Sequence, residues 1–153
     1  MKINMIYILL AAAIFAADFF IKKYIDENRK TGEESRILGG RVILRKCYNK
    51  GAMLNAFEQW PRLVKAISGG ALILMCLLFF FLLREKGKKG LKLGLAMILG
   101  GGAGNLCDRL TKGRVVDYFS FQSRFPKLTS IVFNLSDMFI FLGAALMLIF
   151  HKK

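Results

Sequence analysis

Four long apolar segments, separated by shorter polar stretches, constrain this chain more than any other feature of its sequence. They cover about residues 3–21, 63–83, 91–107 and 131–150. A helix needs about 20 residues to cross the hydrocarbon core of a bilayer, and each segment is close to that length. The sequence therefore predicts an all-α membrane protein with four transmembrane helices, in which residues 1–153 form a single integral membrane domain.

The composition agrees with a membrane protein that has basic loops. The chain is 55% hydrophobic and carries a formal net charge of +14, and a soluble basic domain would be less apolar. The basic residues occur in short groups between the apolar segments and form no stripe beside aromatic residues, so we expect no nucleic acid partner. An N-terminal signal peptide is the alternative for residues 3–21, and the apolar segments that follow argue against it.

The distribution of basic residues predicts the topology. Five of the nine residues in the loop 84–92 are Lys or Arg, and such loops remain in the cytoplasm. We therefore expect this loop and both termini in the cytoplasm, and the polar segment 23–61 outside. Residues 41–45 predict a short strand and Gly39-Gly40 a turn. These features favour a small extracytoplasmic β-sheet in segment 23–61, after the first helix. Residues 111–130 predict a second outer loop.

Small residues in two of the apolar segments predict close helix packing. Ser68-Gly69-Gly70-Ala71 would give the second helix a small-residue face, and Gly100 and Gly104 form a GxxxG step in the third. Such faces let helix backbones approach closely in membranes. We expect Gly100 and Gly104 to pack against a neighbouring helix; the alternative is that they leave room for a ligand.

Polar residues gather at the ends of the third and fourth segments that we expect outside. Asn105 and Arg109 are four residues apart and share a helix face, and Asn134 and Asp137 are three apart. Asp117 lies in the loop between the two segments. We expect Asp137 six residues inside the fourth helix, roughly 9 Å below its start. A lone carboxylate there costs on the order of 3 kcal/mol and needs a partner.

Two further acidic positions lie near these residues. Asp18 and Lys22 are four apart on the first helix, with the acid first, which is the favoured order for an ion pair. An interfacial ion pair that ends the helix and a direct role in chemistry are equally good interpretations. Asp108 lies beside Arg109 and could pair with it or with Arg114.

Two carboxylates in an apolar site, Asp117 and Asp137, favour acid–base chemistry. When such groups are close, one keeps a proton and the other stays charged. The pair can take a proton from a water and donate one to a carbonyl oxygen, which is aspartic-type peptide hydrolysis. A single histidine, His151, and no CxxC pair leave little for a histidine-dependent nucleophile or a zinc site, so we expect no metal and no cofactor. A structural ion-pair cluster accounts for the same residues equally well.

Three sequence blocks resemble, in order, those of the lipoprotein signal peptidases (signal peptidase II). They are Asn49-x-Gly51-Ala52, the stretch Gly104-Asn105-x-x-Asp108-Arg109 continuing through Gly113 to Val115-Val116-Asp117-Tyr118, and Phe133-Asn134-x-Ser136-Asp137. Asp18-x-x-x-Lys22, at the end of the first apolar segment, resembles a fourth block. The resemblance extends over the whole chain, with four spans and the right length.

The resemblance implies a multi-pass aspartic endopeptidase of the bacterial inner or plasma membrane, with its active site at the extracytoplasmic face. The implied substrates are prolipoproteins whose cysteine already carries a diacylglyceryl group, cut on the amino side of that cysteine. Asp117 and Asp137 match the catalytic pair. The positions that match substrate-binding or supporting residues are Asn49, Gly51, Asn105, Arg109, Asn134, Asp18 and Lys22. We expect the lipidated substrate and membrane lipid as partners, and a monomer.

The chain departs from the family at several positions. The family usually has Gln at Phe19, Ala-Phe-Ser at Met53-Leu54-Asn55 and Ala at Ser136. These departures leave both aspartates in place and concern substrate and inhibitor preference. The alternative is a non-catalytic lipid- or lipoprotein-binding relative, which would tolerate loss of either aspartate. A presenilin-type protease would need a GxGD motif, and a proton-coupled carrier would need its carboxylates nearer the midplane.

Overall fold

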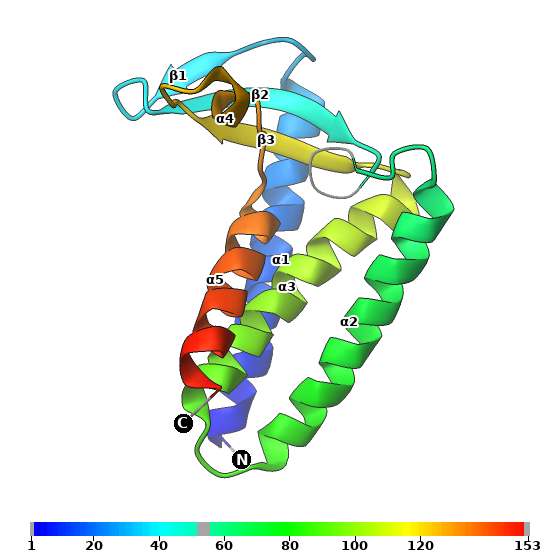
Figure 1. The fold of residues 1–153 in the computed structure, drawn as a ribbon, viewed down its shortest axis with the longest axis vertical. Helices are drawn as coiled ribbons and strands as arrows, with labels where there is room; N and C mark the ends of the chain where they lie inside the picture. The colour runs from blue at the N-terminus through cyan, green and yellow to red at the C-terminus, as the bar shows by residue number, and fades with distance from the viewer. Residues whose placement is uncertain (1, 52–55, 152–153) are drawn as a thin grey trace.

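A bundle of long helices carries a small sheet across one end (Figure 1). The computed structural model describes residues 2–51 and 56–151, so Met53, Leu54 and Asn55 lie outside the described residues. The long helices are α1 (Lys2–Asn28), α2 (Pro61–Arg84), α3 (Lys89–Thr111) and α5 (Leu135–Phe150). α1 begins and α5 ends at the end of the bundle opposite the sheet, beside the loop that joins α2 to α3 (Figure 1).

Three helices within the described ranges are long and apolar enough to cross a membrane. They are Asn4–Asn28, Pro61–Arg84 and Lys89–Thr111. The fourth long helix, α5, has only 16 residues. The sequence predicted a longer helix, over residues 131–150. The helix is shorter because Phe133 pairs as extended chain with Phe119 and Asn134 caps the helix, so α5 begins only at Leu135.

The first helix is longer than its apolar segment and connects the bundle to the sheet. It continues to Asn28, past the predicted end at residue 21. Ile25, in this extension, is buried against Val116 and Tyr118, and the hydroxyl of Tyr48 donates a hydrogen bond to Asp26 at 2.6 Å. The sheet therefore rests on the end of a helix that also passes through the bundle.

The sheet is antiparallel, with strand order β1-β2-β3. β1 (Ser35–Ile37) and β2 (Val42–Asn49) follow α1 as predicted, with a turn at Gly39-Gly40, but β2 extends well beyond the strand predicted at residues 41–45. The third strand, β3 (Val115–Phe121), and a short helix, α4 (Pro126–Thr129), lie in the segment predicted as an outer loop. The sequence analysis predicted neither element, and β3 forms because its β-branched and aromatic residues pair along β2.

Helix α3 is the centre of the bundle and packs on α1, α2 and α5. A Cβ atom at Gly100 would lie 2.7 Å from the Ala11 carbonyl oxygen of α1, and one at Gly104 would lie 2.5 Å from the Ser136 hydroxyl of α5. Both glycines therefore allow close helix contact, as predicted. The prediction of close helix contact at Gly69 and Gly70 is wrong, since an added Cβ there would meet no atom of the described residues within 4 Å.

Candidate active site

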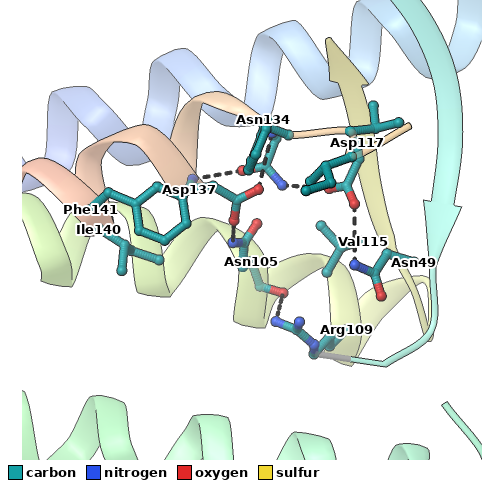
Figure 2. A pocket seen from close by; sticks show the side chains of 12 residues that line it. Asn49, Asn105, Arg109, Val115, Asp117, Asn134, Asp137, Ile140 and Phe141 are labelled. Carbon is teal, nitrogen blue, oxygen red and sulfur yellow. Dashed lines mark hydrogen bonds between the residues drawn. The ribbon is translucent and has the colours of Figure 1, made fainter. Parts of the chain in front are cut away.

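A pocket of about 190 Å³ lies where α3, α5 and the sheet meet. Its polar lining consists of Asn49, Asn105, Arg109, Asp117, Asn134 and Asp137 (Figure 2). Its apolar lining consists of Val115, Ile131, Val132, Phe133, Ile140 and Phe141. Residues from three separate sequence blocks thus face one cavity whose lining is both polar and apolar (Figure 2).

Asn134 connects the two carboxylates of the pocket. Its side-chain amide donates to Oδ1 of Asp117 at 2.7 Å, and its backbone N–H donates to Oδ2 of Asp137 at 3.1 Å. Asp117 comes from β3 and Asp137 from α5, 20 residues apart in the chain. Asn134 is fully buried, so the two carboxylates are brought together by a rigid bridge.

The first turn of α5 sets the position of Asp137. Asn134 is the N-cap residue and Asp137 the third helical residue, and each accepts a hydrogen bond from the backbone of the other. The expectation that Asp137 lies six residues inside the helix, roughly 9 Å deep, is therefore wrong, because residues 131–133 are not helical. Partial positive charge at a helix N-terminus stabilises an anion in this position.

Two more asparagines complete the hydrogen bonds to the carboxylates. Asn105 of α3 donates to Oδ1 of Asp137 at 2.8 Å, and Asn49 of β2 donates to Oδ2 of Asp117 at 3.2 Å. The backbone N–H of Gly51 in turn donates to Oδ1 of Asn49 at 3.0 Å, which closes a tight turn after β2. Each carboxylate thus accepts two N–H donors and leaves acceptor capacity for a further ligand.

Arg109 fastens the turn after β2 to helix α3. Its Nη2 donates to the carbonyl oxygen of Gly51 at 3.0 Å and its Nη1 to the carbonyl oxygen of Asn105 at 3.4 Å. The third nitrogen, Nε, is buried and has no hydrogen-bond partner among the described residues. The guanidinium therefore lines the pocket and holds the turn after β2 against α3.

A buried ion-pair cluster lies directly behind Asn105. The ammonium of Lys22 lies 2.6 Å from Asp18 and 3.4 Å from Asp108, and it donates to Oδ1 of Asn105 at 2.7 Å. Asp18 and Lys22 are 0% and 2% exposed, and α1 continues to Asn28. The pair is thus not an interfacial one that ends the helix; it orients the amide that reaches Asp137.

Asp108 has a role that the sequence interpretation missed. Its Oδ2 accepts the backbone N–H of Val116 at 3.2 Å, and its Oδ1 pairs with Lys112 at 3.3 Å. It was expected to pair with Arg109 or Arg114, but the Arg114 guanidinium lies over the Tyr48 ring at 3.5 Å. The spacing of four between Asp108 and Lys112 was a readable signal. Asp108 fixes the strand residue that precedes Asp117.

Ser136 is the second residue whose part was not predicted. Its hydroxyl donates to Oδ2 of Asp18 at 2.6 Å and its backbone N–H donates to Oδ1 at 3.2 Å. The departure noted at this position therefore adds a hydrogen bond between α5 and α1. Phe19, the departure beside Asp18, is 41% exposed and stacks on Phe15, so it lies on the outside of the bundle.

The environment of Asp117 favours a proton on this carboxyl near neutral pH. Asp117 is 5% exposed. Burial, and secondarily the neighbouring Asp137 carboxylate, raise its pKa to about 7, against the lowering effect of the amide donors Asn134 and Asn49. One carboxyl of the pair can therefore carry a proton under physiological conditions.

Membrane-length helices and a pocket with two hydrogen-bonded carboxylates define a helical membrane protein with a paired-aspartate site. A family model described as Signal peptidase (SPase) II matches residues 10–152. The chain belongs to the signal peptidase II family.

Individual relatives agree with this assignment. The chain is 32% identical over 149 residues to a lipoprotein signal peptidase of Wigglesworthia glossinidia brevipalpis, covering 95% of this chain and 92% of the relative. It is 33% identical to that of Lactobacillus johnsonii, covering 95% and 90%. A solved bacterial membrane enzyme superposes with a TM-score of 0.79 at 18% identity, covering 94% of this chain and 85% of that one. A second superposes with a TM-score of 0.72 at 19% identity, covering 94% and 90%.

Proposed function

We propose that this chain is an aspartic endopeptidase that removes the signal peptide from diacylglyceryl-modified prolipoproteins, cutting on the amino side of the lipidated cysteine. The observation that carries the proposal is the bridge made by Asn134 between Asp117 and Asp137 in one pocket. The similarity to lipoprotein signal peptidases supports the substrate class.

The proposed chemistry needs one protonated and one ionised carboxyl. The raised pKa of Asp117 supports Asp117 as the acid, and the position of Asp137 at the N-terminus of α5 supports Asp137 as the base. Asp137 takes a proton from a water molecule while the oxygen of that water attacks the scissile carbonyl carbon. Asp117 donates its proton to the carbonyl oxygen. Asp137 then gives its proton to the amide nitrogen, and Asp117 takes a proton back from a hydroxyl of the tetrahedral intermediate. The C–N bond breaks, and the protonated Asp117 and ionised Asp137 are restored.

The pocket lining suits a substrate that stays partly in the bilayer. Ile140 and Phe141 of α5 continue the pocket from Asp137 toward the helical bundle (Figure 2), where an acyl chain or an apolar signal peptide would lie. The asparagines and Arg109 lie on the side of the sheet and suit the peptide backbone.

We further propose that α5 is the fourth crossing and that the sheet and pocket lie at the extracytoplasmic face of a bacterial membrane. The basic loop at the opposite end of the bundle supports this orientation. A cysteine placed at Lys88, in a variant without the three native cysteines, should react with an impermeant reagent only after the cells are opened. Labelling of this cysteine in intact cells would show that the protein has the opposite orientation in the membrane.

The function is tested with purified protein and a lipidated prolipoprotein. Asp117→Asn and Asp137→Asn should each abolish cleavage, and the double variant should be little worse than either, because residues that act as a unit are not additive. Asp26→Asn is the matched control, since Asp26 lies outside the pocket, and should keep activity within a few-fold.

The same experiment separates the catalytic from the non-catalytic function. If a folded Asp117→Asn or Asp137→Asn variant still cleaves the lipidated substrate, the paired-aspartate mechanism is refuted. Binding of the lipidated substrate without cleavage by the wild type would identify a lipoprotein-binding relative instead.

A further inference from the structure

A separate pocket of about 270 Å³ lies at the opposite end of the bundle, around the loop between α2 and α3. It is lined by Asn4, Tyr7, Leu83, Arg84, Glu85, Lys86, Gly87, Lys89 and Lys92. Four of these side chains are basic and one is acidic. Because α2 ends and α3 begins here, and both are long enough to span a membrane, the pocket lies at the level of a membrane surface.

Lys92 gives this pocket a buried positive charge. The side chain is only 4% exposed. Its ammonium donates to the carbonyl oxygen of Glu85 at 2.7 Å and to Oδ1 of Asn4 at 3.3 Å, and Asn4 is itself held by the carbonyl oxygen of Leu83 at 2.6 Å. Both acceptors are neutral, and no ion pair joins Lys92 to any described carboxylate. An ammonium buried without a counter-charge is costly.

Neither of the ordinary arrangements for a lysine near a helix end applies here. A snorkelling lysine extends its ammonium into water, whereas the buried ammonium of Lys92 donates to Asn4 and to the Glu85 carbonyl oxygen. The nearby Glu85 does not neutralise it, since the Glu85 carboxylate is turned to Lys88 at 3.8 Å and is 59% exposed. The pocket therefore keeps an excess of positive charge that an anion would balance.

We propose that this pocket binds the phosphate group of an anionic phospholipid. Lys92 provides the buried charge, and Arg84, Lys86 and Lys89 provide exposed cations at the rim. Basic pockets between helices at a membrane surface suit such headgroups. Phe80 and Phe81, on the last turns of α2, are 52% and 62% exposed and offer an apolar surface for the acyl chains, which favours a lipid over free phosphate.

The test measures lipid binding by the full-length protein, independently of peptidase activity. Native mass spectrometry in a neutral detergent compares phosphatidylglycerol with phosphatidylcholine. We expect phosphatidylglycerol to bind about tenfold more tightly, and Lys92→Met to reduce that preference about five- to tenfold. Lys88→Gln is the matched control. It removes a cation from the same loop at a residue that does not line the pocket, and it should change binding less than about twofold.

Two rim variants and competition by inorganic phosphate complete the test. If Lys92→Met does not fold, the exposed rim variants Lys86→Gln and Lys89→Gln should together weaken phosphatidylglycerol binding in the same way. Displacement by inorganic phosphate would show that the phosphate group alone is recognised, and persistence would show that the acyl chains contribute; either result supports the site. Equal binding of the two lipids, or equal effects of Lys92→Met and Lys88→Gln, would overturn it.

Discussion

Asn134, the residue that caps α5, donates a hydrogen bond from its side-chain amide to Asp117 at 2.7 Å. The backbone N–H of the same residue donates to Asp137 at 3.1 Å. The separation of the two carboxylates is therefore set by the first turn of a helix and by a strand paired to the residues before it. Regular backbone structure on both sides holds the pair more rigidly than a loop would.

Asn134→Ser should separate capping from catalysis. Serine caps helices about as well as asparagine, so α5 should persist, but the shorter side chain loses the donor to Asp117. Loss of this donor leaves a buried oxygen of Asp117 without its partner, which costs about 1–3 kcal/mol, so we expect kcat to fall roughly 5- to 100-fold. Cleavage kinetics and circular dichroism measure the two effects. Unchanged kcat in the folded variant would contradict the bridging role.

The stability of the protein should fall as pH rises, because of Asp117. Its folded pKa is about 7 against an ordinary value of 3.8, so the folded state binds the proton more tightly than the unfolded state. The stabilising contribution is complete below about pH 4 and is lost as pH rises through about 7, up to about 4 kcal/mol in all. Asp117→Asn should therefore raise Tm above wild type at pH 8 but not at pH 4. An equal Tm difference at both values would refute this assignment.

Arg109→Lys should impair turnover although it keeps the charge. The guanidinium reaches the carbonyl oxygens of both Gly51 and Asn105, and an ammonium does not reproduce that fork. Loss of one such hydrogen bond predicts a fall in kcat/KM of roughly tenfold. Arg114→Lys is the control, since Arg114 lies over Tyr48 and does not line the pocket. Similar kinetics in the two variants would remove Arg109 from the site.

Much of the site could be predicted from the sequence because its residues lie at short, regular spacings. Asn105 and Arg109 share a face of α3, and Asp117 and Asp137 were recognised as carboxylates next to apolar segments. Their convergence on one pocket follows from the antiparallel neighbours α3 and α5. The matching blocks of the family supplied the roles, which spacing alone left open between catalysis and a structural cluster.

The parts that were not predicted depend on pairing across the chain. Residues 131–133 are apolar and were taken as helix, yet Phe133 pairs with Phe119, and no local pattern reveals a partner so distant in sequence. Asn134 and Asp137 at a spacing of three were a readable capping signal. The link from Asp108 to Val116 depends on how β3 folds back on α3, which only the tertiary structure determines.

Two adjacent lysines on α1 provide the sharpest test of the buried cluster. Lys22 is 2% exposed and contacts Asp18, Asp108 and Asn105. Lys23 is 58% exposed and lies 4.0 Å from Glu27. Lys22→Met leaves the buried carboxylate of Asp18 without a cation and that of Asp108 with Lys112 alone, so we expect a loss of about 3–5 kcal/mol. Lys23→Met removes an exposed pair and should cost less than about 1 kcal/mol.

Lys22→Met should also affect the reaction, because Lys22 holds the oxygen of Asn105 while the amide of Asn105 holds Asp137. At a temperature where the variant remains folded, we expect kcat to fall while the KM for the lipidated substrate changes little, since Lys22 does not line the pocket. Thermal unfolding in detergent and steady-state cleavage measure both effects. If Lys22→Met and Lys23→Met give the same Tm and the same kcat, the buried cluster neither stabilises the fold nor positions Asp137.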